Sequence, residues 1–251
     1  MKDRGCNLEC IKNDKGGDVR EFVGPVKIVL IDVPRSAYVC KTCYAAAIVL
    51  AQMMMAVVTL TVIIYSMSFK KRNMFKALHI FLGAIGFQAC IPSGILSLNN
   101  LSGSAAPMKV RDRKYEHMLL QIVGILCGFT GAIISCFSNF STLLTVHSIF
   151  GFAANIIFFV CGGSGLYIYN FYEGKLSPDT MAVVGRFIYL AHRLLGILGF
   201  LASTACFICG TIKPPFKIWL IWSEEMFYIL IIFCALYSLI IVFKPLKELS
   251  N

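Results

Sequence analysis

Six long apolar runs constrain the fold of this chain more than any other feature. They cover residues 44–68, 74–98, 116–138, 142–168, 184–210 and 217–243. A helix of about 20 apolar residues crosses the hydrocarbon core of a bilayer, whereas the strands of a membrane barrel are about 10 residues long and alternate in hydropathy. We therefore predict an all-α integral membrane protein, a six-helix bundle embedded in the lipid bilayer.

Two charged tails flank the apolar part of the chain. Residues 1–43 contain eight Lys or Arg and six Asp or Glu, and their first 20 positions lack the apolar segment of a signal peptide. Within this tail, the run VKIVLIDV at residues 26–33 is too short to span a bilayer and predicts a surface strand or an interfacial contact. The predicted organisation is a tail (1–43), a six-span domain (44–243) and a second tail (244–251).

The distribution of basic residues predicts the orientation of the six spans. The side that holds both termini carries 16 Lys or Arg, and the opposite side carries 6. Because basic loops remain in the cytoplasm, both termini are expected to be cytosolic. The formal net charge of +10 is then explained by topology and requires no nucleic acid partner.

Cysteine is frequent, with 11 residues, but seven of them lie inside the predicted spans, where Cys packs as a small apolar residue. Cys40 and Cys43 precede the first span on the cytosolic side, where they are candidates for palmitoylation or are simply reduced thiols. A zinc site formed by these two cysteines with Cys6 and Cys10 is a weaker alternative, because a long stretch of chain separates the two pairs.

The four histidines of the chain fall in a regular pattern. His79, His117, His147 and His192 lie near the N-terminal ends of spans two, three, four and five. Since successive spans run in opposite directions, His79 and His147 are expected near the non-cytosolic face, and His117 and His192 near the cytosolic face. Histidines inside a membrane usually face the bundle interior and mark functional sites. Two facing imidazoles can hold one metal centre, so the pattern predicts two stacked centres.

Haem iron fits two histidine ligands better than zinc does. A zinc site needs four ligands, and spans two to five contain no acidic residue beyond the terminal Glu116. A porphyrin supplies four nitrogens, so the protein adds only two axial ligands. Small residues also follow the histidines on the same helix face: Gly83, Gly151 and Gly196 at an offset of four, and Gly86, Gly124, Ala154 and Gly199 at an offset of seven. These positions would leave room for a flat macrocycle, although Gly is also common where membrane helices cross.

Four stretches around the histidines resemble one known family. FKALHIFLGAIGFQAC, KYEHMLLQIVG, TVHSIFGFAAN and RFIYLAHRLLG, in this order, are similar to helices two to five of the cytochrome b561 family, and the likeness covers roughly residues 44–243. The end of span two, ACIPSGILSLNN, lacks the tyrosine and arginine of the chromaffin-granule members. The chain therefore most resembles the short cytochrome b561 domain-containing reductases.

The resemblance implies a di-haem transmembrane reductase. Two haem b groups, one held by His79 with His147 and one by His117 with His192, would carry electrons from cytosolic ascorbate to monodehydroascorbate or a ferric chelate across the membrane. A six-coordinate iron favours electron transfer over oxygen chemistry. Haems placed a quarter of the way into a core of about 30 Å would lie about 15 Å apart. The family also suggests an endomembrane, the endoplasmic reticulum or a vesicle, and is compatible with a homodimer.

Basic clusters next to the two histidine pairs are candidate docking sites for these anions. Lys109, Arg111, Arg113 and Lys114 precede His117 and could attract ascorbate; Lys71, Arg72 and Lys76 precede His79 and could attract the acceptor. Solvated loops that obey the charge rule are the alternative interpretation of the first cluster.

Two other functions remain open from the residues alone. A six-span transporter could use the intramembrane histidines as a proton relay, although the missing intramembrane carboxylates disfavour it. A structural six-span adaptor, in which each histidine only satisfies helix contacts, is the third hypothesis.

Overall fold

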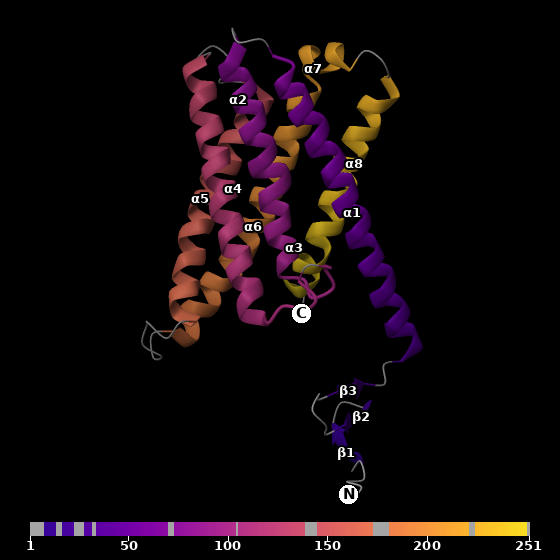
Figure 1. Cartoon of the computed structure of the whole chain (residues 1–251). Coiled ribbons are helices and arrows are strands. Elements are labelled where there is room, and N and C mark those ends of the chain that lie inside the picture. Colours follow the sequence, from indigo (N-terminus) through magenta and orange to yellow (C-terminus); the bar gives the residue numbers. More distant parts are fainter. Residues whose placement is uncertain are drawn as a thin grey trace, which may run out of the picture. The chain divides into compact units, whose positions relative to one another are not determined.

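The computed structural model describes residues 8–13, 17–22, 28–31, 34–69, 73–103, 105–138, 145–172, 181–220 and 224–249. The chain forms two compact units, Met1–Ala46 and Ala47–Asn251. Figure 1 shows the elements of both.

The first unit contains a small antiparallel sheet. Its strands β1 (Leu8–Asn13), β2 (Gly17–Phe22) and β3 (Ile28–Ile31) pair in chain order. Leu8 lies opposite Phe22, and Phe22 lies opposite Ile28. The strand expected within residues 26–33 is therefore present as β3, and sequence analysis missed its two partners.

Helices make up the membrane part of the chain, and six of them are long and apolar enough to cross a bilayer, which confirms the predicted fold class. The helices are α1 (Arg35–Met67), α2 (Met74–Gly83), the π-helix η2 (Ala84–Cys90), α3 (Ile91–Ser97), α4 (Val110–Ser138), α5 (Val146–Tyr172), α6 (Met181–Thr211), α7 (Pro214–Trp219) and α8 (Glu224–Leu249). The second span consists of α2, η2 and α3 without interruption.

Two span boundaries differ clearly from the prediction. Helix α1 begins nine residues before the apolar run at residue 44, because polar residues at its start do not stop a helix. The sixth span begins at residue 225 instead of 217, since Pro214 and Pro215 start a separate short helix, α7. Proline is favoured in the first turn of a helix, where its missing N–H has no partner to lose.

Four of the spans pack as two antiparallel pairs, which we name the first helix pair (α2, η2 and α3 with α4) and the second helix pair (α5 with α6). Glycines bring the first pair into close contact: a Cβ added at Gly86 would lie 2.7 Å from the carbonyl oxygen of Gly124. In the second pair, a Cβ at Gly199 would lie 3.0 Å from Ile157 and Phe158. Small residues that let membrane helices approach closely are typical of such crossings.

These contacts correct one part of the sequence interpretation. Gly86, Gly124 and Gly199, which follow a histidine by seven positions, are occupied by helix packing and do not provide open space for a macrocycle. The fully buried Ala154 belongs to the core as well.

We name each end of the bundle after one residue that lies there, Asn99 or Lys213. The Asn99 end contains the connection from α3 to α4 and the end of α8, where the Lys244 ammonium donates to the side-chain oxygens of Asn99 and Asn100 at 3.3 and 3.5 Å. The Lys213 end contains the starts of α2 and α5 and the link from α6 to α7. In Figure 1 the Asn99 end is at the bottom and the Lys213 end at the top.

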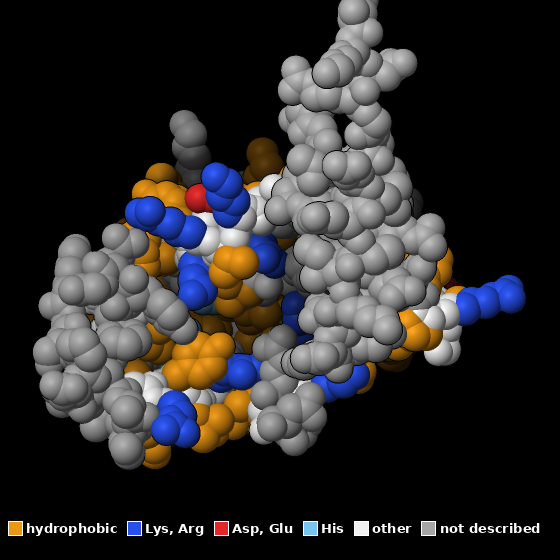
Figure 2. Space-filling model, turned by 90° about the horizontal axis from the view of Figure 1, so that it is seen from below, with side chains coloured by type: hydrophobic (Ala, Val, Ile, Leu, Met, Phe, Trp, Pro, Cys, Tyr) orange, Lys and Arg blue, Asp and Glu red, His pale blue; other side chains and the backbone are white. Residues whose placement is uncertain are grey.

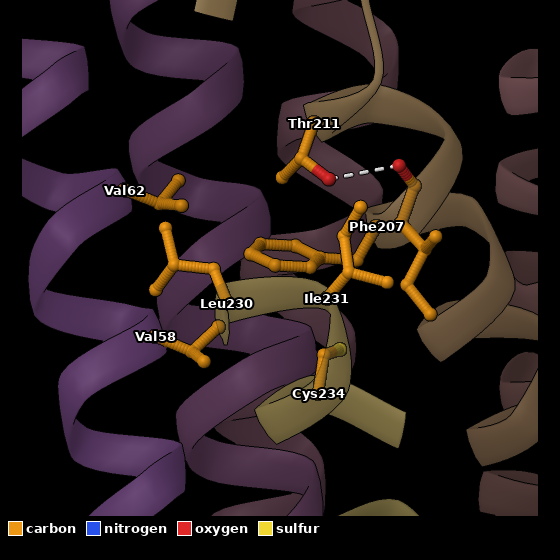
Figure 3. Close-up of a pocket in the computed structure, with 8 residues that line it drawn as sticks. Val58, Val62, Phe207, Thr211, Leu230, Ile231 and Cys234 are labelled. Carbon is orange, nitrogen blue, oxygen red and sulfur yellow. Dashed lines mark hydrogen bonds between the residues drawn. The ribbon is translucent and has the colours of Figure 1, made fainter. Parts of the chain in front are cut away.

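An apolar pocket lies between α1, α6 and α8 (Figure 3). Val58, Phe207 and Leu230 contribute to its lining, and the Thr211 hydroxyl beside it donates to the Ile208 carbonyl oxygen of its own helix at 2.8 Å. No histidine or charged side chain lines this pocket, so it is separate from the site described next.

Candidate functional site

Two pairs of imidazoles face each other between the first and the second helix pair. The rings of His79 (α2) and His147 (α5) have centroids 6.0 Å apart and an interplanar angle of 90°. The rings of His117 (α4) and His192 (α6) have centroids 6.3 Å apart and an angle of 79°. The structure thus brings together the same partners that the alternating span directions predict.

Each imidazole is anchored to the helix that packs against its own. The Nδ1 atoms of His79, His117, His147 and His192 donate to the carbonyl oxygens of Gly131, Gly94, Cys206 and Cys161 at 2.8, 2.7, 2.8 and 3.0 Å, respectively. Because a carbonyl oxygen only accepts, Nδ1 carries the proton in a neutral ring and Nε2 is left as the nitrogen with a free lone pair. Metal-bound histidines are held by this kind of hydrogen bond, which fixes the tautomer and the ring orientation.

The second helix pair repeats one local arrangement at both ends. The Cys161 thiol of α5 donates to the His192 carbonyl oxygen of α6 at 3.4 Å, and the Cys206 thiol of α6 donates to the His147 carbonyl oxygen of α5 at 3.3 Å. Both cysteines are buried, as predicted for packing residues. Ser164 adds a hydroxyl oxygen 3.2 Å from His192 Nδ1. The two cysteines therefore pack against the imidazoles, a role that the sequence did not indicate.

Ring separation tests whether each imidazole pair fits a metal held between two axial nitrogens. Two collinear metal–imidazole bonds of about 2.0 Å place the ring centroids about 6.3 Å apart. The measured separations of 6.0 and 6.3 Å agree with this value. In both pairs Nδ1 bonds to a backbone carbonyl, so Nε2 is the ring nitrogen that is left for a metal. The four histidines therefore fit two bis-imidazole centres.

Glycines leave room beside the rings. A Cβ at Gly165 would lie 3.0 Å from His192 Cε1, and a Cβ at Gly210 would lie 3.0 Å from both Cε1 and Nδ1 of His147. A Cβ at Gly83 would meet nothing within 4 Å, and one at Gly196 would make an ordinary contact of 3.8 Å with Cys161. The third glycine at an offset of four, Gly151, has less room, since a Cβ there would lie 3.0 Å from the Cys206 sulfur. The sequence did not indicate Gly165 and Gly210, which lie on the other helix of the same pair.

A charged pocket of about 430 Å³ opens at the Asn99 end, the end that holds His117 and His192. Its lining consists of Lys109, Arg111, Asp112, Tyr115 and Tyr169. Figure 2 looks onto this end and shows Lys and Arg side chains gathered around a hollow. The pocket contains two of the four cations proposed from the sequence, and its acidic and tyrosine residues were missed.

The other two cations of that cluster, Arg113 and Lys114, are half-buried and do not line the pocket. Arg113 lies one turn before His117, and its carbonyl oxygen is 3.5 Å from the Ser97 hydroxyl. Because Ser97 also donates to Gly94, the acceptor of His117, this stretch of α4 is tied to the same histidine pair.

At the Lys213 end, the structure places one member of the predicted acceptor cluster. Lys76 is exposed, three residues before His79, whereas Lys71 and Arg72 lie outside the described residues. Lys213 lies within electrostatic reach of both His79 and His147. Sequence analysis counted Lys213 on this side of the membrane without assigning it to the site.

Metal clusters of the zinc type are absent from the residues that the structure describes: nowhere in them do three or more His, Cys, Asp or Glu side chains converge. The alternative zinc site proposed from Cys6, Cys10, Cys40 and Cys43 includes side chains outside the described ones.

Comparison with known proteins gives one match. The sequence model of the family "Eukaryotic cytochrome b561" matches residues 78–217, more than half of the chain and a range that includes all four histidines. No curated protein and no solved structure matches the chain significantly.

Proposed function

Because the chain belongs to the eukaryotic cytochrome b561 family, we propose that it is a di-haem oxidoreductase that moves electrons across a membrane from cytosolic ascorbate to monodehydroascorbate or a ferric chelate. Family membership implies ascorbate-driven transmembrane electron transfer. The side of the membrane on which the donor binds, the identity of the acceptor and the residues that ligate the haems belong to our proposal.

The observation that carries the proposal is the presence of two facing imidazole pairs. His79 with His147, and His117 with His192, are the proposed axial ligands of two b haems. Bound haem would supply a one-electron carrier with no open coordination position, which favours electron transfer over oxygen binding. The protein holds each ring through Nδ1, so that Nε2 stays unprotonated and is oriented by the backbone of the neighbouring helix.

The pocket at the Asn99 end supports ascorbate as the donor. Ascorbate is an anion near neutral pH, and Lys109 and Arg111 are the cations of the pocket, with Asp112 as its one acidic residue. The hydroxyls of Tyr115 and Tyr169 can bond to the hydroxyls of a sugar acid. The pocket lies at the same end of the bundle as His117, so a donor bound there would be next to the proposed cytosolic haem.

The cations at the Lys213 end support an anionic acceptor. Lys76 is exposed, and Lys213 lies within electrostatic reach of His79 and His147. Monodehydroascorbate and ferric chelates of organic acids are both anions, and a positive surface raises their local concentration.

Orientation follows from the same residues. The end of α8 bonds to Asn99 and Asn100 through Lys244, so the C-terminal end of α8, the donor pocket and His117 share one end of the bundle. The excess of basic residues makes this end cytosolic, together with the N-terminus. We further propose an endomembrane, the endoplasmic reticulum or a vesicle, as the location. The short domain-containing reductases are the proposed subgroup, since ACIPSGILSLNN lacks the granule-type tyrosine and arginine.

Reconstituted vesicles test the proposal. The full chain is inserted with its Asn99 end outward, a ferric chelate is enclosed, ascorbate is added outside, and ferrous iron is measured with an enclosed chelator. Wild type should reduce the enclosed iron, and His117→Ala and His192→Ala should abolish this reduction. Lys217→Gln, which changes an exposed cation at the opposite end, is a control for general damage. Equal reduction by wild type and both histidine variants would contradict the proposal and favour the transporter or adaptor hypotheses.

A further inference from the structure

Each of the four spans that carry a histidine also carries a backbone carbonyl that accepts a hydrogen bond from a histidine of the neighbouring helix. In three of these spans, the histidine and the carbonyl are separated by the same number of residues. The spacing from His117 to Gly131 on α4 equals the spacing from His147 to Cys161 on α5. It also equals the spacing from His192 to Cys206 on α6. These fourteen positions of α-helix bring the two groups back to nearly the same face, about 21 Å apart along the axis. The common spacing sets the two imidazole levels.

The second span differs from the other three: the spacing from His79 to Gly94 is one residue longer. Both residues nevertheless take part in the same kind of hydrogen bond as their counterparts. In a regular α-helix one extra residue rotates the following positions by about 100° around the axis. Gly94 would then be turned by about 100° relative to the equivalent carbonyls of the other three spans and would no longer lie in line with the His117 imidazole.

A π-helix absorbs the extra residue. Helix η2 (Ala84–Cys90) lies between His79 and Gly94, and the Ile91 N–H donates to the carbonyl oxygen of Gly86, five residues earlier. A π-helical turn holds one residue more than an α-helical turn, so it restores the face that the insertion would otherwise shift.

Contacts within η2 and directly after it hold this part of the span against α4. Gly86 would meet Gly124 if it carried a Cβ, and the Phe87 ring lies where a Cβ of Gly128 would lie. Beyond the π-helix, Ile91 packs on Gly124. Residues 88–90 are thus the part of the span that lies between fixed contacts.

The two membrane helices without histidines contact this part. Gln88 is fully buried, and its side-chain oxygen accepts a hydrogen bond from the Tyr237 hydroxyl of α8. The Thr59 hydroxyl of α1 lies 3.4 Å from the Gln88 carbonyl oxygen, to which it donates. The residue four positions after Gln88 is Pro92, which has no N–H to donate to this carbonyl, and the Thr59 hydroxyl supplies a donor instead.

We propose that η2 is a register element: it places Gly94 in line with His79 so that both imidazole pairs form, with Gln88, Tyr237 and Thr59 as positioning residues that keep the π-turn in its place. This inference rests on the proposed haem ligation by the four histidines. It assigns to α1 and α8 a part in the haem sites that their lack of histidines does not suggest.

Single-residue deletions in the full-length protein test the proposal. Deletion of Ala89 inside η2 should convert the π-turn to α-helix and give His79 and Gly94 the same spacing as in the other three spans. Deletion of Leu126, which lies between His117 and Gly131 on α4 and is 60% exposed, removes one residue where no π-turn can compensate. A third variant combines the Ala89 deletion with Tyr237→Phe, which removes the hydroxyl that Gln88 would no longer meet.

Haem content per chain and the ferric EPR signals of the two centres are the measurements. The Ala89 deletion, alone or with Tyr237→Phe, should keep two haems and both signals, and the Leu126 deletion should lose at least one. Loss of haem from both Ala89 variants, or two haems in the Leu126 variant, overturns the register role. If wild type binds no haem, the proposed function fails. Thermal unfolding of the apoproteins then tests the register role separately. An unfolding midpoint closer to wild type for the Ala89 deletion than for the Leu126 deletion supports the register role, and the reverse order refutes it.

Discussion

Gly165→Ala should perturb one histidine pair and leave the other unchanged. The added Cβ would lie 3.0 Å from Cε1 of His192, whereas carbon atoms pack best about 3.5 to 4.0 Å apart. The ring must therefore move by about 0.5 Å or leave its preferred rotamer, at a cost on the order of 0.5 to 1.5 kcal/mol. Since about 1.4 kcal/mol corresponds to a factor of ten in an equilibrium constant, haem affinity at this centre should fall about 2- to 10-fold.

A matched control lies two residues away on the same helix. A Cβ at Gly163 would meet nothing within 4 Å, so Gly163→Ala should leave both centres as in wild type. The assay is haem titration of the apoprotein combined with EPR of the ferric form, which resolves the two centres. In Gly165→Ala, we expect a changed signal and weaker binding at the His117–His192 centre alone. Equal behaviour of the two alanine variants would refute the argument that Gly165 makes room for the imidazole.

Two further predictions concern the donor pocket and the buried network. Arg111→Gln removes one cation of the pocket. An exposed charge pair contributes about 0.2 to 1 kcal/mol, so the KM for ascorbate should rise about 1.4- to 5-fold with little change in kcat. Steady-state reduction at several salt concentrations measures the KM, and an unchanged KM would place ascorbate elsewhere. Gln88→Leu leaves the buried Tyr237 hydroxyl without the Gln88 acceptor and should lower the free energy of unfolding by about 1 to 3 kcal/mol. Denaturant unfolding measures this loss. If the hydrogen bond is the cause, adding Tyr237→Phe to the same chain should recover part of the lost stability.

The sequence predicts the spans and the histidine pairs well because both depend on side-chain patterns. Apolar runs define the spans, and one histidine per span at the same relative depth leaves a single same-depth pairing. His79 with His147 and His117 with His192 follow from span direction alone.

Features made by the backbone were missed for a physical reason. The acceptors of the imidazoles are main-chain carbonyls at residues such as Gly131 and Cys206, and a carbonyl is the same at every position. Their signal is the recurrent spacing from histidine to carbonyl, which becomes visible only when the helix pairs are known.

The π-helix η2 was missed because Ala84–Cys90 is apolar apart from Gln88; its nearest sequence signal is Pro92, which has no N–H to offer the Gln88 carbonyl. Glycines were ambiguous in the sequence because the same residue serves two purposes. Gly86 allows helices to approach, and Gly165 leaves space for a ring. Only the position of the neighbouring helix distinguishes these roles.

Haem content and ferric EPR of the purified full-length protein test the central claim most directly. The account predicts two b haems per chain and two low-spin signals of large g anisotropy, because the imidazole planes of the pairs are nearly perpendicular at 90° and 79°. His79→Ala should remove one signal and His192→Ala the other. A protein without b haem, or one that keeps both signals in either variant, would contradict the assignment of the four histidines.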